Sequence, residues 1–386
     1  AREILARLIH RPGIVLADEV GMGKTFVALA VAVSVAVHDP KRRPVVVMVP
    51  PSLREKWPTD FKLFCEKCLP TEFASRVNCA SAERAVEFLK LLDDPPDRRK
   101  QLLFITHGAM SRGLSDVWVK LAIIAQAIKG RHGVNELRRA LSRVLGELLG
   151  MKWAERHGEG VWETLLTVAP RQWLDVVHEW GIDPEADKNP DTDDDPVPKA
   201  VCDRLPELDT TPVYESLENI PKHRTDSFYE RLTEARQTIN RELRILWGEC
   251  VGSLRLRLPL LILDEAHHLK NPDTKLASLF RCAEARDDME EIAKGPLAGV
   301  FERMLFLTAT PFQLGHAELC SILERFGAVS WSGVTTPTQG REQFEKELTE
   351  LRETLDAAQE AAITLDTAWG RLKNEDLRAN GRIHKE

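Results

Sequence analysis

The sequence contains no long hydrophobic segment and no stretch that resembles a cleavable signal peptide. Its longest apolar run, Phe26–Val37, is shorter than the roughly 20 residues that a helix needs to cross a bilayer. The run directly follows a glycine-rich motif, which favours a buried helix. We therefore expect no contact with a membrane.

Positive charge is also scarce. The formal net charge of the 386 residues is -7, so no overall basic field attracts the chain to nucleic acid. Any nucleic-acid contact must therefore be local. The length exceeds the roughly 250–300 residues at which a single core stops growing, which predicts one α/β domain with a large insertion, or two domains.

Cysteine is too sparse for a scaffold held by disulfides. Seven cysteines are spread along the chain, a usage typical of a reducing compartment. Cys65 and Cys68 form a single CxxC motif, with no second pair at the spacing of a zinc site. We interpret them as two thiols on a helix that follows a strand, and zinc binding is the less favoured alternative.

Five short apolar runs, rich in Val, Ile and Leu, are the main positive signal. They do not alternate with polar residues, which is typical of parallel strands buried on both faces. The runs are Ile14–Ala17, Val45–Val49, Leu102–Thr106, Leu260–Leu263 and Met304–Leu307. A polar motif follows each run, and helical patterns separate them. Because an open parallel sheet binds ligands at the carboxyl ends of its strands, we expect the site at that edge.

The motif after the first run, Asp18–Thr25, has the residue types of a phosphate-binding loop. Its two glycines allow the backbone N–H groups to face phosphates, and the helix that follows adds a partial positive charge. Lys24 would reach the β- and γ-phosphates, and the Thr25 hydroxyl would bind Mg²⁺. Asp18 stands where the strict pattern has glycine, so a plain glycine-rich turn is the alternative.

A second motif, Asp264-Glu265-Ala266-His267, places two carboxylates at the end of the fourth apolar run. Asp264 can hold Mg²⁺ through water, and Glu265 can polarise the attacking water. Capping of the next helix is the alternative role for an Asp-Glu pair. Since a capping pair does not require a phosphate loop elsewhere in the chain, the two motifs together favour a nucleotide site.

These motifs resemble the first RecA-like lobe of Swi/Snf-type superfamily-two helicases. In that family Asp is usual in place of the first loop glycine, as in Leu16–Thr25. Asp264–His267 is similar to the second family motif, and Leu307–Pro311 is similar to the third. Val49–Trp57 resembles a motif that contacts the nucleic-acid backbone, and Ile105–Gly108 lies where the next such motif falls. The bacterial RapA-like branch is especially similar.

The resemblance implies a P-loop NTPase that binds ATP and Mg²⁺. The nucleotide-binding residues would be Asp18, Glu19, Val20, Gly21, Met22, Gly23, Lys24 and Thr25. Lys24, Asp264 and Glu265 would be catalytic, and Thr25 and Asp264 would hold the metal. Coupling of hydrolysis to movement would depend on His267, Thr308, Ala309 and Thr310. Nucleic-acid contacts would come from Pro51, Ser52, Thr106 and His107, although a helix cap and a strand terminus are alternative roles for Ser52 and Thr106.

The resemblance covers residues 1–110 and 256–330, for which we expect an α/β fold with a RecA-like parallel sheet flanked by helices. Residues 111–255 are predicted to form a mainly helical insertion with an acidic loop at 183–198. Its predicted helices are Trp118–Lys129, Asn135–Trp153 and Phe228–Val251. Four tryptophans in this region are expected to form a helical core rather than to stack on bases: Trp153, Trp162, Trp173 and Trp180.

Residues 331–386 contain a heptad pattern, from Phe344 to Leu372, on one long predicted helix. Three interpretations remain open. The helix forms a coiled-coil arm, packs on the insertion, or leads to a second RecA-like lobe outside this chain. The resemblance favours such a lobe, because the family uses it to close over ATP.

The expected function is that of a Snf-type translocase acting on duplex DNA, in the bacterial cytoplasm at the nucleoid. A role in phage defence or in polymerase recycling fits the RapA-like resemblance. One alternative is a nucleotide-gated scaffold that binds protein partners through the insertion or the heptad helix. The other is the motor subunit of a restriction complex.

Overall fold

The computed structural model describes residues 1–19, 21–150, 159–181, 195–252, 257–281, 295–309, 316–333, 336–371, 378–379 and 382–383. At its centre lies a six-stranded parallel sheet with the strand order β1-β6-β5-β2-β4-β3. The strands are β1 (Gly13–Ala17), β2 (Val45–Val49), β3 (Cys79–Ala82), β4 (Leu102–Thr106), β5 (Leu261–Leu263) and β6 (Met304–Thr308). The predicted parallel α/β sheet is therefore confirmed.

Successive residues of the central strands face opposite sides of the sheet, as the pleat requires. Val45, Val47 and Val49 pack with helices α1 (Arg2–His10), α2 (Lys24–His38) and α3 (Lys56–Cys68). Val46 and Met48 belong to the core on the other face, which includes α5 (Ala85–Asp93), α6 (His107–Arg112) and α14 (Lys275–Ser278). The continuous apolar runs in the sequence thus reflect burial on both faces.

Strand β3 is the one strand of the sheet that the apolar runs did not reveal. Its sequence, Cys-Ala-Ser-Ala, consists of small residues and carries little hydrophobic signal. It pairs with β4 at the edge of the sheet, from Cys79 with Leu102 to Ala82 with Ile105. An edge strand of small residues is held by its backbone hydrogen bonds more than by side-chain burial, which explains the missing signal.

Two predictions about the helices nearest the sheet are confirmed. The apolar run Phe26–Val37 lies within α2, and six of its residues are buried against the sheet. Cys65 and Cys68 lie on α3, which follows β2 after the short 3₁₀ helix η1 (Pro51–Leu53) and precedes α4 (Thr71–Ala74). The described residues include no group of three or more His, Cys, Asp or Glu side chains that could hold a metal ion by themselves. None of the helices in the described ranges has the length and apolar character needed to cross a membrane.

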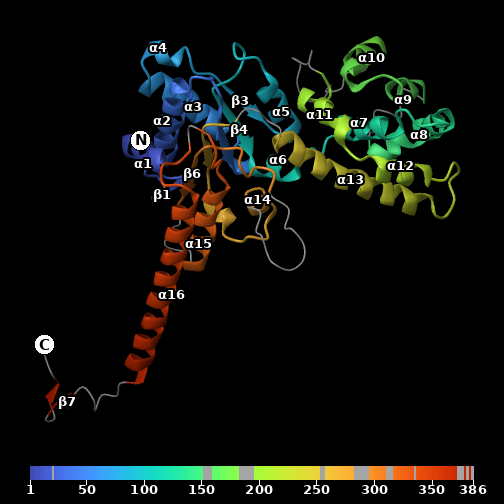
Figure 1. Ribbon diagram of the computed structural model, residues 1–386. Helices are drawn as coiled ribbons and strands as arrows, with labels where there is room; N and C mark the ends of the chain where they lie inside the picture. Colours follow the sequence, from blue (N-terminus) through green and yellow to red (C-terminus); the bar gives the residue numbers. More distant parts are fainter. Residues whose placement is uncertain are drawn as a thin grey trace.

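Beyond α6, helices make up most of the described chain between β4 and β5, and they extend away from the sheet (Figure 1). They are α7 (Val117–Ile128), α8 (Val134–Leu149), α9 (Glu159–Leu165), α10 (Trp173–Glu179), α11 (Lys199–Arg204), α12 (Thr211–Glu218) and α13 (Phe228–Gly252), with 3₁₀ turns η3 (Pro170–Gln172) and η4 (Leu205–Glu207). Their buried residues form one continuous core with one face of the sheet. We call residues 117–252 the helical region.

The helices predicted at Trp118–Lys129 and Phe228–Val251 correspond to α7 and α13 within one residue at each end. The helix predicted for Asn135–Trp153 ends earlier, at Leu149, because Gly150 adopts a left-handed conformation (φ 71°) that terminates it. Trp162 and Trp173 are buried in the helical core, as predicted, whereas Trp180 is 43% exposed. Trp153 and residues 183–194 of the acidic loop lie outside the described residues.

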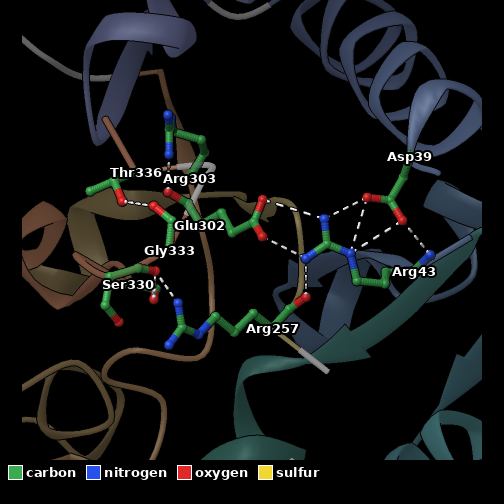
Figure 2. Close-up of polar contacts among 9 residues, drawn as sticks. Asp39, Arg43, Arg257, Glu302, Arg303, Ser330, Gly333 and Thr336 are labelled. Carbon is green, nitrogen blue, oxygen red and sulfur yellow. Dashed lines mark hydrogen bonds and ion pairs between the residues drawn. The ribbon is translucent and has the colours of Figure 1, made fainter. Parts of the chain in front are cut away.

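The amino ends of the strands are braced by a buried ion network (Figure 2). The Arg43 guanidinium is 2.5 Å from Asp39 Oδ1 and 2.5 Å from Glu302 Oε1, and its Nη1 donates to the Arg257 carbonyl at 2.6 Å. Arg43 and Asp39 are both buried. The network connects the end of α2 with the segments that precede β2, β5 and β6.

The last long helix projects from the body of the molecule (Figure 1). After α15 (His316–Glu324) and η7 (Arg325–Ala328), helix α16 spans Arg341–Arg371, and a two-stranded antiparallel sheet follows, β7 (Arg378–Ala379) with β8 (Arg382–Ile383). The start of α16 packs on α15 and η7, and the ring centroids of Trp331 and Phe344 lie 5.8 Å apart there. Its far end is exposed, with Leu365 at 66% and Trp369 at 69%. Leu372 lies outside the described residues.

Candidate nucleotide site

The predicted motif residues gather at the carboxyl ends of the parallel strands. The glycine-rich loop follows β1, Asp264 follows β5, Thr106 ends β4, and Thr308 ends β6. The register places Ala17 beside Thr308, and the backbone N–H of Asp264 donates to the Met48 carbonyl at 2.9 Å. The sheet therefore brings together residues that are separated by more than two hundred positions in the sequence.

The glycine-rich loop turns sharply into α2. Gly21 and Gly23 have positive φ angles, 89° and 77°, that side chains other than glycine rarely adopt. Gly23 caps α2, so the first backbone N–H groups of that helix point out of its amino end. Lys24 Nζ donates to the carbonyls of Asp18 and Glu19, at 2.6 and 2.8 Å. This combination of free N–H groups, a helix amino end and an ammonium group is suited to binding phosphate. Val20 lies outside the described residues.

Asp264 is held in a fixed orientation by two hydrogen bonds. Its Oδ2 accepts from the Trp57 indole Nε1 at 2.9 Å, and its Oδ1 accepts from the Glu265 backbone N–H at 3.0 Å. Burial raises the pKa of the Asp264 carboxyl, and the neighbouring Glu265 carboxylate acts in the same direction. The Trp57 hydrogen bond and the charge of Lys24 oppose that rise. A cation at Asp264 would offset the same burial cost.

Glu265 occupies an unusual backbone conformation. Its φ of 53° and ψ of 50° lie in the left-handed region, which is unfavourable for a residue with a side chain longer than Asn or Asp. The residue lies two positions after the end of β5 and is the N-cap of the 3₁₀ helix η5 (Ala266–Leu269). Backbone strain of this kind is characteristic of functional sites, because it is retained only where the surrounding structure enforces it.

Three histidine rings near these carboxylates contact one another in the order His267, His268, His107. The rings of His267 and His268 lie 4.3 Å apart, and the rings of His268 and His107 lie 6.0 Å apart. His267 Nδ1 is 3.1 Å from Glu265 Oε2, although the angles are not those of a hydrogen bond. Burial and the charge of His268 lower the pKa of His107 to about 4, so His107 is neutral at physiological pH. Burial also lowers the pKa of His268.

The residues predicted to contact nucleic acid differ in their accessibility. Pro51 and Ser52 are exposed on η1, at the carboxyl end of β2. Thr106 is buried, and its Oγ1 accepts from the Ala109 N–H at 3.2 Å, so it caps α6. It also lines a cavity of about 290 Å³ together with Arg54 and Thr59. His107 is only 8% exposed and faces His268.

The remaining predicted residues lie at the end of β6. Thr308 is buried and Ala309 is half-buried, next to the end of β1. Thr310 lies outside the described residues. Mg²⁺ in nucleotide sites is held by one or two protein oxygens, with phosphate oxygens and waters completing the shell. The Thr25 hydroxyl and the Asp264 carboxylate fit that donor set.

Sequence patterns did not assign roles to two residues of the site. Trp57 closes the motif that begins at Val49, but no periodicity indicated that its indole would reach Asp264, 207 positions away. His268 follows the acidic motif directly and could have been noticed as a second histidine beside His267. Comparison of the chain with protein-family models, with curated proteins and with solved structures finds no match. The function is therefore inferred from the geometry of the site.

Proposed function

We propose that the chain is the ATP-binding lobe of a nucleic-acid-dependent motor that hydrolyses ATP with Mg²⁺, most closely a Snf-type translocase on duplex DNA. One observation carries the proposal. The glycine-rich loop with Lys24 and the half-buried Asp264–Glu265 pair come from distant parts of the chain, and they meet at the carboxyl ends of the strands, where Lys24 acts electrostatically on Asp264. A glycine-rich turn or a helix-capping pair alone would not require this convergence.

The residues divide the work by their chemistry. The N–H groups at the start of α2 and the Lys24 ammonium bind and orient the phosphates. Thr25 and Asp264 hold Mg²⁺, which neutralises negative charge on the phosphates when bound. The Glu265 carboxylate accepts a proton from the attacking water, and Trp57 keeps Asp264 oriented.

Coupling to a nucleic acid rests on the elements beside the site. His267 lies 3.1 Å from Glu265, so a movement of η5 would change the environment of the catalytic carboxylate. Exposed Pro51 and Ser52, with Arg54 at the neighbouring cavity, are available to a phosphate backbone at the same edge of the sheet. We propose a second RecA-like lobe and duplex DNA as the partners of this site.

Nucleotide binding is the first test. We expect Mg·ATP to bind the chain in calorimetry and expect Lys24→Ala to lower the affinity at least about tenfold, since a charge-assisted contact contributes about 1.5–3 kcal/mol. Lys67→Ala, which removes an exposed lysine of α3, is the matched control and should bind ATP normally. Equal affinity in the Lys24→Ala and Lys67→Ala proteins would rule out the phosphate-loop assignment.

Hydrolysis is the second test. ATP turnover by the complete protein is measured without nucleic acid, with single-stranded DNA, with duplex DNA and with RNA. We expect the strongest stimulation by duplex DNA, and we expect Glu265→Gln to abolish turnover while ATP stays bound. Glu342→Gln, on the exposed surface of α16, is the control. Bound ATP with no stimulation by any nucleic acid would instead favour a nucleotide-gated scaffold.

A further inference from the structure

A polar hollow lies at the amino ends of the strands, whereas the candidate nucleotide site lies at their carboxyl ends. Its volume is about 900 Å³, and it is lined by the end of α2 and by the segments that lead into β2, β3 and β4. Five of its lining residues are basic: Arg42, Arg76, Arg98, Arg99 and Lys100. We call these residues and the space that they line the basic hollow.

The basic hollow has an excess of positive charge within a chain whose net charge is negative. Asp94 and Asp97 are the acidic residues of its lining. In the part of the chain that the structure describes, the side chains of Arg42, Arg76, Arg98 and Lys100 make no ion pair and no hydrogen bond. Cations gathered without carboxylate partners repel one another, and a bound anion removes that repulsion.

The walls of the basic hollow are held by hydrogen bonds that leave most of its cations free. Arg99 Nε and Nη2 donate to the Asp94 carbonyl at 3.2 and 3.0 Å, which fixes the plane of the guanidinium. Gln101 Oε1 accepts from the Asn78 N–H at 2.7 Å, and the Asn78 carbonyl accepts from the Gln101 N–H at 2.9 Å. The two bonds between Asn78 and Gln101 join the segments before β3 and β4, which form two walls of the basic hollow.

Arg42 adds a basic group to the basic hollow from a third segment, the one before β2. Its φ of 50° is unusual for a residue with a long side chain, and only one other described residue besides glycine, Glu265, has a positive φ. Such a conformation costs of order 1 kcal/mol or more and is retained where surrounding structure or function requires it. Basic groups from three segments thus surround one space.

We propose that the basic hollow binds a small anion that carries two or more phosphate groups. Its volume is within the range of about 300–1,000 Å³ that is usual for small-molecule sites. Arginine binds phosphate oxygens in a bidentate manner, and several arginines on separate segments match several phosphates better than a single one. Because the basic hollow lies at the amino ends of the strands, away from the candidate nucleotide site, anion binding there does not depend on the proposed hydrolysis of ATP.

Inorganic tripolyphosphate is the probe for the test, in calorimetry at physiological ionic strength. The measurements use the Lys24→Ala protein, so that the glycine-rich loop contributes little binding. We expect one tripolyphosphate to bind, at least about tenfold more tightly than inorganic phosphate does. The double variant Arg98→Ala, Lys100→Ala, added to this protein, should weaken binding at least about tenfold.

A matched pair of substitutions separates a specific site from general charge. Lys67→Ala with Lys129→Ala removes the same net charge from exposed positions outside the basic hollow and should leave the affinity unchanged. Equal weakening by both double variants would contradict the proposal, as would the absence of tripolyphosphate binding or an equal affinity for monophosphate. Thermal unfolding verifies that both double variants are folded.

Labelled duplex DNA is the last arm, because its backbone carries the same phosphate chemistry. We expect DNA affinity to be similar in the two double variants. A specific loss of DNA binding in the Arg98→Ala, Lys100→Ala protein, with no tripolyphosphate binding to the parent, would overturn the small-anion proposal in favour of a nucleic-acid surface.

Discussion

Trp57 and Asp264 are joined by a hydrogen bond of 2.9 Å between the indole Nε1 and a carboxylate oxygen. Trp57 is 1% exposed, so packing fixes its position. Its hydrogen bond therefore fixes the orientation of the Asp264 carboxylate. We expect Trp57→Phe to lower kcat for ATP hydrolysis about tenfold, with little change in KM, because a hydrogen bond to a charged group contributes about 1.5–3 kcal/mol. The Mg²⁺ concentration for half-maximal activity should also rise.

Trp173→Phe is the matched control for this substitution. Trp173 is fully buried in the helical region, and its Nε1 donates to the carbonyls of Leu165 and Val168 at 2.9 and 3.1 Å. Its loss should lower the free energy of unfolding as much as the loss of Trp57 does, but leave kcat and the Mg²⁺ dependence unchanged. Similar kinetics in the two variants would show that Trp57 has only a structural role.

The lowered pKa of His107 leads us to expect that the stability of the fold depends on pH. The folded state lowers its pKa from 6.5 to about 4, so between these values the unfolded chain binds more protons than the folded chain. The free energy of unfolding should therefore fall on acidification, by about 2 kcal/mol from His107 between about pH 7 and about pH 5. Urea unfolding at both pH values measures the change.

His107→Gln removes the titrating group and is compared with His223→Gln, a surface substitution. The His107 variant should lose less stability on acidification than the parent does, whereas the His223 variant should follow the parent. His268, whose pKa is also lowered, accounts for part of the remaining slope. An identical pH slope in the His107 variant and the parent would show that His107 is not held neutral by the fold.

The sheet was largely predictable because its physical cause is local in sequence. Strands buried on both faces require continuous apolar runs, and Val45–Val49 and Leu102–Thr106 were predicted with the bounds that the structure has. The edge strand Cys79–Ala82 buries little and therefore leaves little trace in the sequence. The glycine-rich loop and the acidic motif stood out in the sequence because each is a run of particular residue types in consecutive positions.

Contacts between distant segments could not be predicted in the same way. The Trp57–Asp264 bond and the ring contact between His107 and His268 depend on strand order, which no local pattern specifies. The basic hollow has the same origin, because Arg42, Arg76 and Arg98 belong to separate segments that meet only when β2, β3 and β4 are aligned. The negative net charge of the chain gave no indication of the basic hollow, because a chain with an excess of acidic residues can still have several basic residues close together in the fold.

Glu265 predicts a conflict between stability and activity. Its left-handed backbone costs about 1 kcal/mol for a glutamate, and asparagine adopts this conformation more readily. Glu265→Asn should therefore raise the free energy of unfolding by a few tenths to about 1 kcal/mol and abolish hydrolysis. Glu265→Gln, which keeps the strain, should abolish hydrolysis without this gain. A less stable Asn variant would show that the left-handed conformation is not a source of strain.

The buried network around Arg43 predicts a large loss of stability when its cation is removed. Arg43 pairs with Asp39 and Glu302, and all three side chains are largely inaccessible, with exposures of 8%, 3% and 11%. Arg43→Met would leave two buried carboxylates without a partner and should cost about 3–5 kcal/mol. Arg7→Met, which removes the exposed pair between Arg7 and Glu3, should cost less than about 1 kcal/mol.

The pH dependence of the same variants distinguishes loss of the ion network from loss of packing. Burial alone would raise the pKa of Asp39, but the hydrogen bonds and the charge of Arg43 outweigh it, and the pKa lies below its usual value. The stability that Asp39 contributes is therefore present at neutral pH and is lost as the pH falls through its lowered pKa. In Arg43→Met that acid-induced loss should disappear, and adding Asp39→Asn and Glu302→Gln should recover part of the stability at neutral pH. An Arg43→Met protein that loses no more stability than Arg7→Met does would show that the network contributes little to the fold.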